Sequence, residues 1–301
     1  MVDYSKPALS FEAQADRLLE RGLVAERDLL IRRLSATSYF RLSGYIYPFR
    51  QEGSEALQPG LSLDTIWELY SFDQRLRTLL LDAIEAIEVY VRTQLAYHFA
   101  HDFGPFGYHD VQNLPNLSPH DCGNWHQKLD LQVRRSRRSH EEFVLHFFRK
   151  YGEAHTQLPI WMLIELMDFG ATLTFYRGAS DDYKKRIARM VEIPDRVLSS
   201  WLLALNTVRN RCAHHSRLWN WTLGNSVLLP GARKYPVWHD PRLDNRQMGI
   251  ILTLCRHLLG HISPSNQWSR RVFELFEQFP NQPISEMGLP ENWKEHPLWK
   301  L

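Results

Sequence analysis

Residues 62–101, S-L-D-T-I-W-E-L-Y-S-F-D-Q-R-L-R-T-L-L-L-D-A-I-E-A-I-E-V-Y-V-R-T-Q-L-A-Y-H-F-A-H, decide the fold of this chain. Apolar residues recur there at steps of three and four, which is the spacing of one helix face. They are Leu69, Leu76, Leu80, Ala83, Ile84, Ile87, Val91 and Leu95. The acid-to-base pairs Asp73–Arg77 and Glu88–Arg92 suit the exposed side of such a helix. The stretch predicts one long helix, which Gly104 and the proline after it end.

Helical periodicity also covers most of the remaining chain, and no stretch of useful length alternates as a strand would. Ser10 can cap a first helix that Gly22 stops. The other predicted helices are 26–37, 124–138, 141–151, 160–177, 181–191, 195–215, 245–260 and 264–278. An aromatic stretch after residue 38 is broken by Gly44 and Pro48, and the segments without a clear period are 53–60, 107–123 and 218–244. We therefore expect an all-α bundle with peripheral helices.

The composition is that of a folded chain with little net charge. Of its 301 residues 44% are hydrophobic, and the net charge is +2, which excludes a polybasic binder but leaves room for a local basic patch. The three separated cysteines predict neither a disulfide framework nor a cysteine zinc site. The first residues form no signal peptide, and no segment approaches the roughly 18 apolar residues of a membrane span. We expect a soluble, reduced, cytoplasmic protein with no membrane partner.

The stretch N-T-V-R-N-R-C-A-H-H-S-R-L-W-N-W at 206–221 concentrates Arg, Asn and His at the end of an apolar helix. One cation is enough to complement a helix dipole, so this many polar side chains suggest a site. Asn210 and His214 share a helix face at i,i+4. Arg209 lies about 140° round from His214. These two side chains can converge through the length of the Arg, through a distorted helix end or through a second copy of the chain.

This combination of side chains suits a phosphodiester. Arg offers a planar fork to phosphate oxygens and keeps its charge at any working pH. A His can take a proton from a hydroxyl or give one to a leaving oxygen, and an Asn can orient the imidazole or hold a phosphate oxygen. RNA carries its own nucleophile, the 2′-OH, so we expect cleavage of RNA rather than DNA, with no cofactor and no metal.

The motif Arg209-Asn210-x-x-x-His214 resembles the R-x(4–6)-H signature of HEPN-domain ribonucleases. Ordered blocks over roughly residues 6–220 resemble the Abi-like family of bacterial abortive-infection proteins, of the AbiD and AbiF type. They are K-P at 6–7, S-Y-F-R-L-S-G-Y at 38–45, F-D-Q-R-L-R at 72–77, I-E-A-I-E at 84–88, P-I-W at 159–161 and C-A-H-H-S-R-L-W-N at 212–220.

The resemblance implies a HEPN-type helical core at 61–222, with an N-terminal helical segment at 1–60 packed on it and a C-terminal extension at 223–301. It implies a metal-independent endoribonuclease toxin in phage defence, with one composite site built from two motifs across a homodimer. A His would assist attack of the 2′-OH, and Arg side chains would stabilise the developing charge. RNA is the implied substrate, and a small non-coding RNA is a further implied partner.

The candidate catalytic residues are Arg209, His214 and Asn210. The residues that the resemblance or the position assigns to support or RNA binding are His215, Arg211, Arg217, Arg77 and Glu85. No metal site is expected, because Cys212 and the two histidines after it lack a second ligand pair at zinc spacing.

Several alternatives remain open from the sequence. The 206–221 segment can be a helix end decorated with cations, a non-catalytic RNA-binding module or part of a phage-sensing interaction protein. The basic run at 134–138 can hold an RNA backbone or be a solvated helix face. Four aromatic residues can stack bases or pack in the core, and we favour the core; they are Tyr39, Phe40, Tyr45 and Tyr47.

Overall fold

The computed structural model describes residues 3, 5, 7–240, 243–282 and 284–300. Twelve α-helices and no β-sheet are present in this part of the chain, which confirms the all-α prediction. The helices are α1 (Phe11–Glu20), α2 (Arg27–Thr37), α3 (Tyr39–Ile46), α4 (Leu63–Phe103), α5 (Pro119–Arg138), α6 (Glu142–Tyr151), α7 (Ile160–Leu163), α8 (Phe169–Gly178), α9 (Asp181–Met190), α10 (Asp195–Ala213), α11 (Met248–Ile262) and α12 (Trp268–Gln278).

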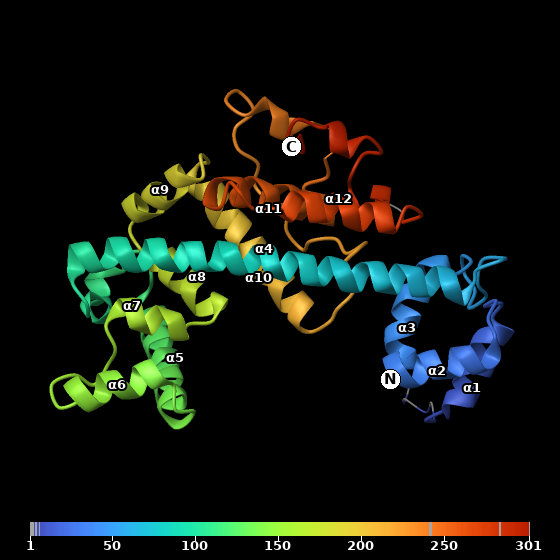
Figure 1. Ribbon diagram of the computed structural model, residues 1–301, viewed down its shortest axis with the longest axis horizontal. Helices are drawn as coiled ribbons and strands as arrows, with labels where there is room; N and C mark the ends of the chain where they lie inside the picture. Colours follow the sequence, from blue (N-terminus) through green and yellow to red (C-terminus); the bar gives the residue numbers. More distant parts are fainter. Residues whose placement is uncertain (1–2, 4, 6, 241–242, 283, 301) are drawn as a thin grey trace.

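The long helix α4 is the spine of the molecule and confirms the prediction from 62–101 (Figure 1). Ser62 caps its start, accepting a hydrogen bond of 3.1 Å from the backbone N–H of Thr65. Gly104 ends it with a φ of 74°, a conformation that favours glycine. The predicted apolar face of the helix is buried throughout. Since that face is apolar at helical spacing, burial against several neighbours fixes the helix in place.

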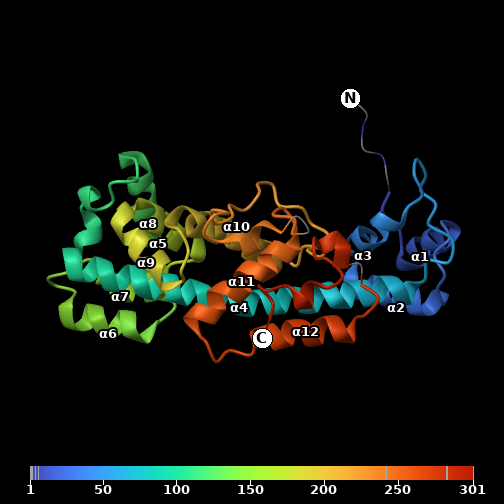
Figure 2. The same ribbon diagram turned by 90° about the horizontal axis from the view of Figure 1, so that it is seen from above.

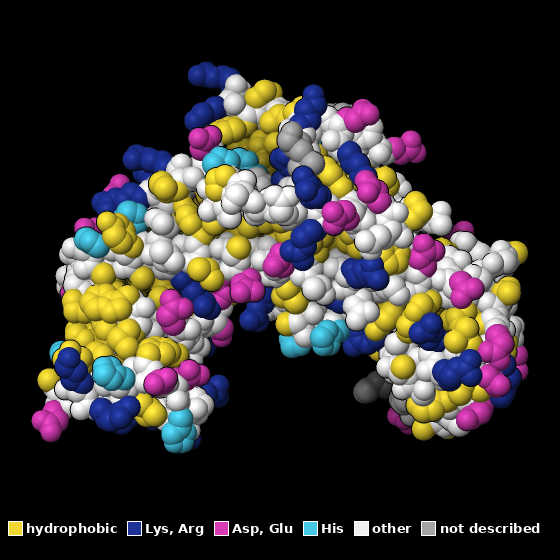
Figure 3. All heavy atoms as spheres, in the orientation of Figure 1, with side chains coloured by type: hydrophobic (Ala, Val, Ile, Leu, Met, Phe, Trp, Pro, Cys, Tyr) yellow, Lys and Arg dark blue, Asp and Glu magenta, His cyan; other side chains and the backbone are white. Residues whose placement is uncertain are grey.

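The other helices are distributed along α4. Helices α1–α3 lie at one end of the spine and α5–α7 at the other, while α10 crosses α4 near its middle (Figures 1 and 2). Helices α11 and α12 also pack on α4, and the indole N–H of Trp268 donates to the Leu79 carbonyl at 2.8 Å. The result is an arch with a wide concavity between its two ends (Figure 3).

The prediction of a single helix over 160–177 is wrong. Helix α7 passes into a 3₁₀ turn at Ile164–Leu166, and Met167 then adopts an extended conformation. Asp168 caps α8, accepting a hydrogen bond of 2.7 Å from the backbone N–H three residues on. The Arg92 guanidinium donates to the Met167 carbonyl, so a contact from α4 holds this break in place.

Two further predictions placed loops or breaks where helices are found. The aromatic stretch is helical up to residue 46, because Ser38 caps α3 and Gly44 is accommodated inside it. The predicted loop over 107–123 ends early, since Ser118 caps α5 and Pro119 occupies its first turn. Proline costs nothing at that position because the first N–H groups of a helix have no partner within it.

The remaining helix predictions are confirmed with shifted ends. Helix α10 ends at Ala213, two residues before the predicted end, and α11 and α12 begin at Met248 and Trp268, later than predicted. The described part of the 218–244 loop contains only a 3₁₀ turn at Pro236–His239. No helix in the described ranges combines the length and the apolar character that crossing a lipid bilayer requires.

Candidate functional site

Helix α10 ends in a Schellman turn that places two histidines side by side at the surface. The Ser216 N–H donates to the Arg211 carbonyl and the His215 N–H to the Cys212 carbonyl, both at 2.9 Å. His214 is the C-cap residue, and His215 follows with a φ of 55°, in the left-handed region where glycine is usual. Both imidazoles are exposed. The helix is regular up to this turn, since the His214 N–H still donates to the Asn210 carbonyl at 3.0 Å, so a distorted helix end does not bring Arg209 and His214 together.

Asn210 links Arg209 to the helix face that carries His214. The Arg209 Nη1 donates to the Asn210 Oδ1 at 3.4 Å. Asn210 is exposed and lies one turn before His214 on the same face of α10, as its spacing predicts. No hydrogen bond or ion pair among the described residues joins Arg209 directly to His214. The structure therefore brings Arg209 to Asn210 and leaves the imidazole of His214 free to face solvent.

One acidic residue of α4, Glu88, interacts electrostatically with Arg209, and Glu85 acts in turn on Glu88. Burial raises the pKa of Glu88, while the charges of Arg92 and Arg209 act against this rise. Glu88 also accepts a hydrogen bond from Arg92. The side chains of Glu88 and Arg92 are only 13% and 17% exposed, so the prediction that this pair lies on the exposed side of the helix is wrong. Glu85 is exposed, and its charge contributes to the raised pKa of Glu88.

The prediction that Asp73 and Arg77 lie on the exposed side of α4 is also wrong, because both are buried. Asp73 accepts a 2.6 Å hydrogen bond from the Tyr45 hydroxyl and a further one from Arg77. It also accepts from the backbone N–H groups of Leu218 and Trp219, at 3.1 and 2.8 Å. One buried carboxylate therefore ties α3, α4 and the chain after α10 together.

Arg77 completes this buried network. Its guanidinium donates to the Tyr45 hydroxyl at 3.1 Å and to the Ser216 carbonyl at 3.3 Å. Arg77 is 5% exposed, so the contacts that it makes position the turn after α10. Asp73 is a site residue that the sequence-based prediction missed, although the sequence holds a signal for it. Asp73 lies four residues after Leu69 and three before Leu76, so helical spacing places this acid on the apolar face.

A hollow of about 320 Å³ lies between α3 and the end of α10. Its lining includes Arg41, Arg217, both histidines and the exposed Phe40, and it contains no acidic residue. Arg41 donates to the His215 carbonyl, and Arg217 donates to the carbonyl of a glycine in α3. Figure 3 shows histidine side chains over this end of α10, on the concave underside of the arch.

Two other residues of the 206–221 segment are engaged within the protein. The Arg211 guanidinium donates to the Arg217 carbonyl at 2.9 Å and lies 4.2 Å from the ring centroid of Trp221, and burial lowers its pKa. Cys212 is buried, and burial raises the pKa of its thiol to about 12, so it is not a nucleophile at neutral pH. No group of three or more His, Cys, Asp or Glu in the described ranges is placed to hold a metal ion.

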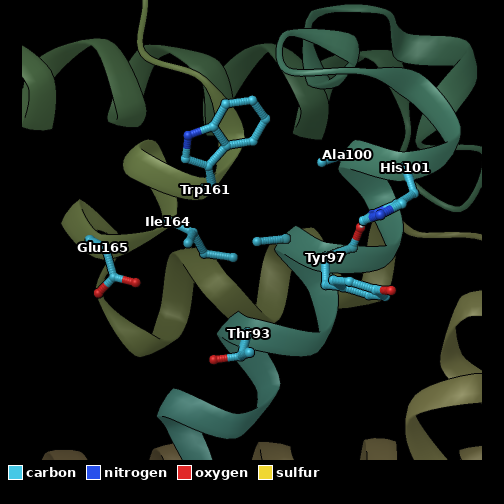
Figure 4. Close-up of a pocket in the computed structure, with 8 residues that line it drawn as sticks. Thr93, Tyr97, Ala100, His101, Trp161, Ile164 and Glu165 are labelled. Atoms are coloured by element: carbon cyan, nitrogen blue, oxygen red, sulfur yellow. The ribbon is translucent and has the colours of Figure 1, made fainter. Parts of the chain in front are cut away.

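A second hollow, of about 460 Å³, lies between the C-terminal half of α4 and α7 (Figure 4). Tyr97 and Trp161 line it with side chains that are 57% and 51% exposed. Figure 4 shows Ile164 beside Trp161, with Thr93 across from them on α4. This is an open, largely apolar surface whose lining includes one glutamate and one histidine.

The basic run in the last turns of α5 is exposed. Arg137 lies over the ring of Phe148, 4.5 Å from its centroid. No ion pair involves the run among the described residues, so its charge remains available to a polyanion. The arginines of the run are Arg134, Arg135, Arg137 and Arg138.

Residues 32–220 match the family model described as Abi-like protein. No match to a curated protein or to a solved structure was found. The matched range includes α3, α4, α10 and the turn that follows α10. The K-P block at 6–7 precedes this range, and Lys6 lies outside the described residues. Because the match covers more than half of the sequence, the chain belongs to the Abi-like protein family.

Proposed function

We propose that this protein is a metal-independent endoribonuclease of the HEPN type that acts as a toxin in phage defence. The observation that carries the proposal is the end of α10. An exposed imidazole, His214, shares a helix face with Asn210, whose amide oxygen accepts from Arg209. Membership of the Abi-like family supports the role in abortive infection. The acid-free hollow beside His214 adds a cationic surface suited to a polyanion.

The proposed reaction uses the 2′-OH of the substrate as nucleophile. His214 takes the proton of this hydroxyl, and the 2′-oxygen attacks the adjacent phosphorus. The bond from phosphorus to the 5′-oxygen breaks, and the leaving oxygen receives a proton from a second imidazole. Arg209 stabilises the negative charge that develops on the phosphoryl oxygens. The products are a 2′,3′-cyclic phosphate and a 5′-OH.

Incubating the protein with single-stranded RNA in EDTA tests this function. We expect new ends that carry 2′,3′-cyclic phosphate and 5′-OH, and we expect resistance where deoxyribose replaces the ribose 5′ to the cleaved linkage. Strict dependence on magnesium, or cleavage of DNA, would contradict the proposal. Tight, salt-sensitive RNA binding without new ends identifies a non-catalytic RNA-binding module. Absence of both binding and cleavage is the result that a phage-sensing interaction protein predicts.

We further propose that the active form is a homodimer that pairs through α4. A stripe of exposed residues at i,i+4 spacing runs along this helix. It consists of Glu85, Val89, Thr93 and Tyr97. The stripe begins near the Glu88–Arg209 cluster and ends at the apolar hollow of Figure 4. Exposed apolar surface continuous with a polar site is typical of an interaction surface. A second copy on the stripe would place both Arg209 side chains along one seam.

Tyr97→Glu is expected to make the protein monomeric and to abolish cleavage together with dimerisation. A carboxylate buried without a partner opposes association, and we expect the dimer dissociation constant to rise at least about 100-fold. Sedimentation velocity and the EDTA cleavage assay measure the two effects. Leu131→Glu is the matched control, because Leu131 is similarly exposed, at 51%, but lies on α5. A Tyr97→Glu protein that sediments as the wild type does would refute this interface.

A further inference from the structure

Phe40 is an aromatic side chain that the fold leaves in solvent. It is 90% exposed, whereas the next most exposed large hydrophobic side chain of the described residues is Tyr47, at 64%. The rest of α3 behaves as a core helix, with Leu42 and Tyr45 buried. The expectation that these aromatics pack in the core is therefore confirmed for Tyr45 and, with partial burial, for Tyr39. It is wrong for Phe40 and Tyr47. A single exposed phenylalanine is not evidence of a site, so its surroundings decide what it can do.

The hollow beside Phe40 is held in shape by contacts from both of its walls. Arg41 on α3 donates to the His215 carbonyl, and Arg217 donates back to the Gly44 carbonyl of α3. Ser38, with a φ of 67°, sets the sharp entry into α3 two residues before Phe40. These reciprocal bonds fix α3, and with it the backbone of Phe40, relative to the turn after α10. A ligand therefore meets a preformed surface, and ordering that surface on binding costs less conformational entropy.

The charges around the hollow are all of one sign. Each guanidinium carries five N–H donors, and the structure gives one donor of Arg41 and one of Arg217 a protein partner. His214 and His215 add two imidazoles to the same lining. No carboxylate lines the hollow, so an anion is not repelled there. A flat, exposed ring beside two arginines suits a ligand with both an aromatic ring and a phosphate, which is the chemistry of a nucleotide.

We propose that Phe40 is the stacking platform for one base of the bound RNA, with Arg41 and Arg217 contacting the phosphate next to that base. This inference rests on the proposed function and assigns a binding subsite to it. Because His214 lines the same hollow, the stacked nucleotide lies beside the cleaved linkage. Every base has a π-face, so this subsite positions the strand without selecting one sequence.

A single-stranded, fully 2′-O-methylated RNA with 2-aminopurine at successive positions tests the subsite, because it binds without being cleaved. Stacking on an aromatic ring quenches 2-aminopurine fluorescence. We expect quenching with the wild type, loss of quenching with Phe40→Ala and about a 10- to 100-fold rise in Kd. Phe40→Trp should retain both. Tyr47→Ala is the matched control and should match the wild type, since Tyr47 is exposed but does not line the hollow.

The outcomes separate the subsite from the nuclease. Quenching that depends on Phe40, in a protein that forms no new ends on unmodified RNA, supports the subsite and overturns the nuclease. Cleavage with the same KM in wild type and Phe40→Ala, together with unchanged quenching, overturns the subsite alone. The Phe40→Ala protein can also bind RNA normally and yet fail to protect cells from phage. That result assigns Phe40 to a protein partner and overturns the RNA subsite. Absence of RNA binding by the wild type overturns both proposals.

Discussion

Replacing His214 by alanine is expected to lower the rate of RNA cleavage by about 10²- to 10⁴-fold, which is the usual contribution of a general acid or base. The imidazole is exposed at the C-cap of α10, and only its backbone N–H takes part in the helix end. The substitution should therefore leave the free energy of unfolding nearly unchanged. Single-turnover cleavage at saturating protein, with the 2′,3′-cyclic phosphate ends counted, measures the rate of the chemical step.

Arg209→Ala is expected to cause a loss of similar size, because charge stabilisation in the transition state disappears. Arg209→Lys should recover only part of the rate, since an ammonium lacks the planar fork. If the two residues act on one phosphate, their effects are not additive, and the double variant Arg209→Ala/His214→Ala falls little below the single variants.

Matched controls guard against a general effect of removing a cation. Arg196 lies in the first turn of the same helix and is exposed, and His120 is exposed on α5. Arg196→Ala and His120→Ala should cleave at the wild-type rate. An outcome in which His214→Ala also cleaves at that rate removes the imidazole from the mechanism. Equal losses in all four variants would indicate that bulk charge, rather than a site, drives the activity.

Asp73→Ala is expected to destabilise the fold by about 3–5 kcal/mol, the range observed when one partner of a buried ion pair is removed. The substitution leaves the guanidinium of Arg77 buried without its carboxylate and leaves two backbone N–H groups, those of Leu218 and Trp219, without an acceptor. Guanidinium unfolding followed by circular dichroism measures the loss of stability. Hydrogen exchange at the amides of Leu218 and Trp219 should accelerate more than exchange in α12.

Asp82→Ala provides the comparison on the same helix. Asp82 pairs with Arg271 at 2.6 Å, but the two side chains are 50% and 47% exposed. An exposed pair contributes about 1 kcal/mol or less, so this variant should remain close to the wild type. If Asp73→Ala is no less stable than Asp82→Ala, the buried network does not hold the turn after α10.

The fold was largely predictable where a helix has a long, regular apolar face. Helix α4 has such a face along its length, and sequence spacing therefore locates it to within a few residues. The break between α7 and α8 could not be predicted in the same way. The contact from Arg92 to the Met167 carbonyl joins residues 75 positions apart in sequence, so it has no local signal. The Asp168 cap of α8 is the local part of the break.

The candidate site was predictable only within α10. Helical spacing correctly places Asn210 and His214 on one face, and adjacency accounts for the Arg209–Asn210 contact. Asp73 accepts a hydrogen bond from the Leu218 N–H, which lies 145 residues further along the chain, so the local sequence holds no sign of this contact. The i,i+4 spacing of Asp73 and Arg77 suggests an exposed pair and therefore places the acid on the wrong side of the helix. The hollow likewise combines α3 with the turn after α10, which no periodicity can reveal.

Helix α4 runs for 41 residues, about 60 Å at 1.5 Å per residue, without a single glycine or proline. Sharp bends in long helices arise mostly at such residues, so α4 has no natural hinge. Bending within α4 therefore does not bring the two ends of the arch together, and the concave side does not close through a hinge in this helix. If the proposed nuclease and its dimer are correct, an inhibitor has to occupy that concave surface, in competition with RNA, or separate the two subunits.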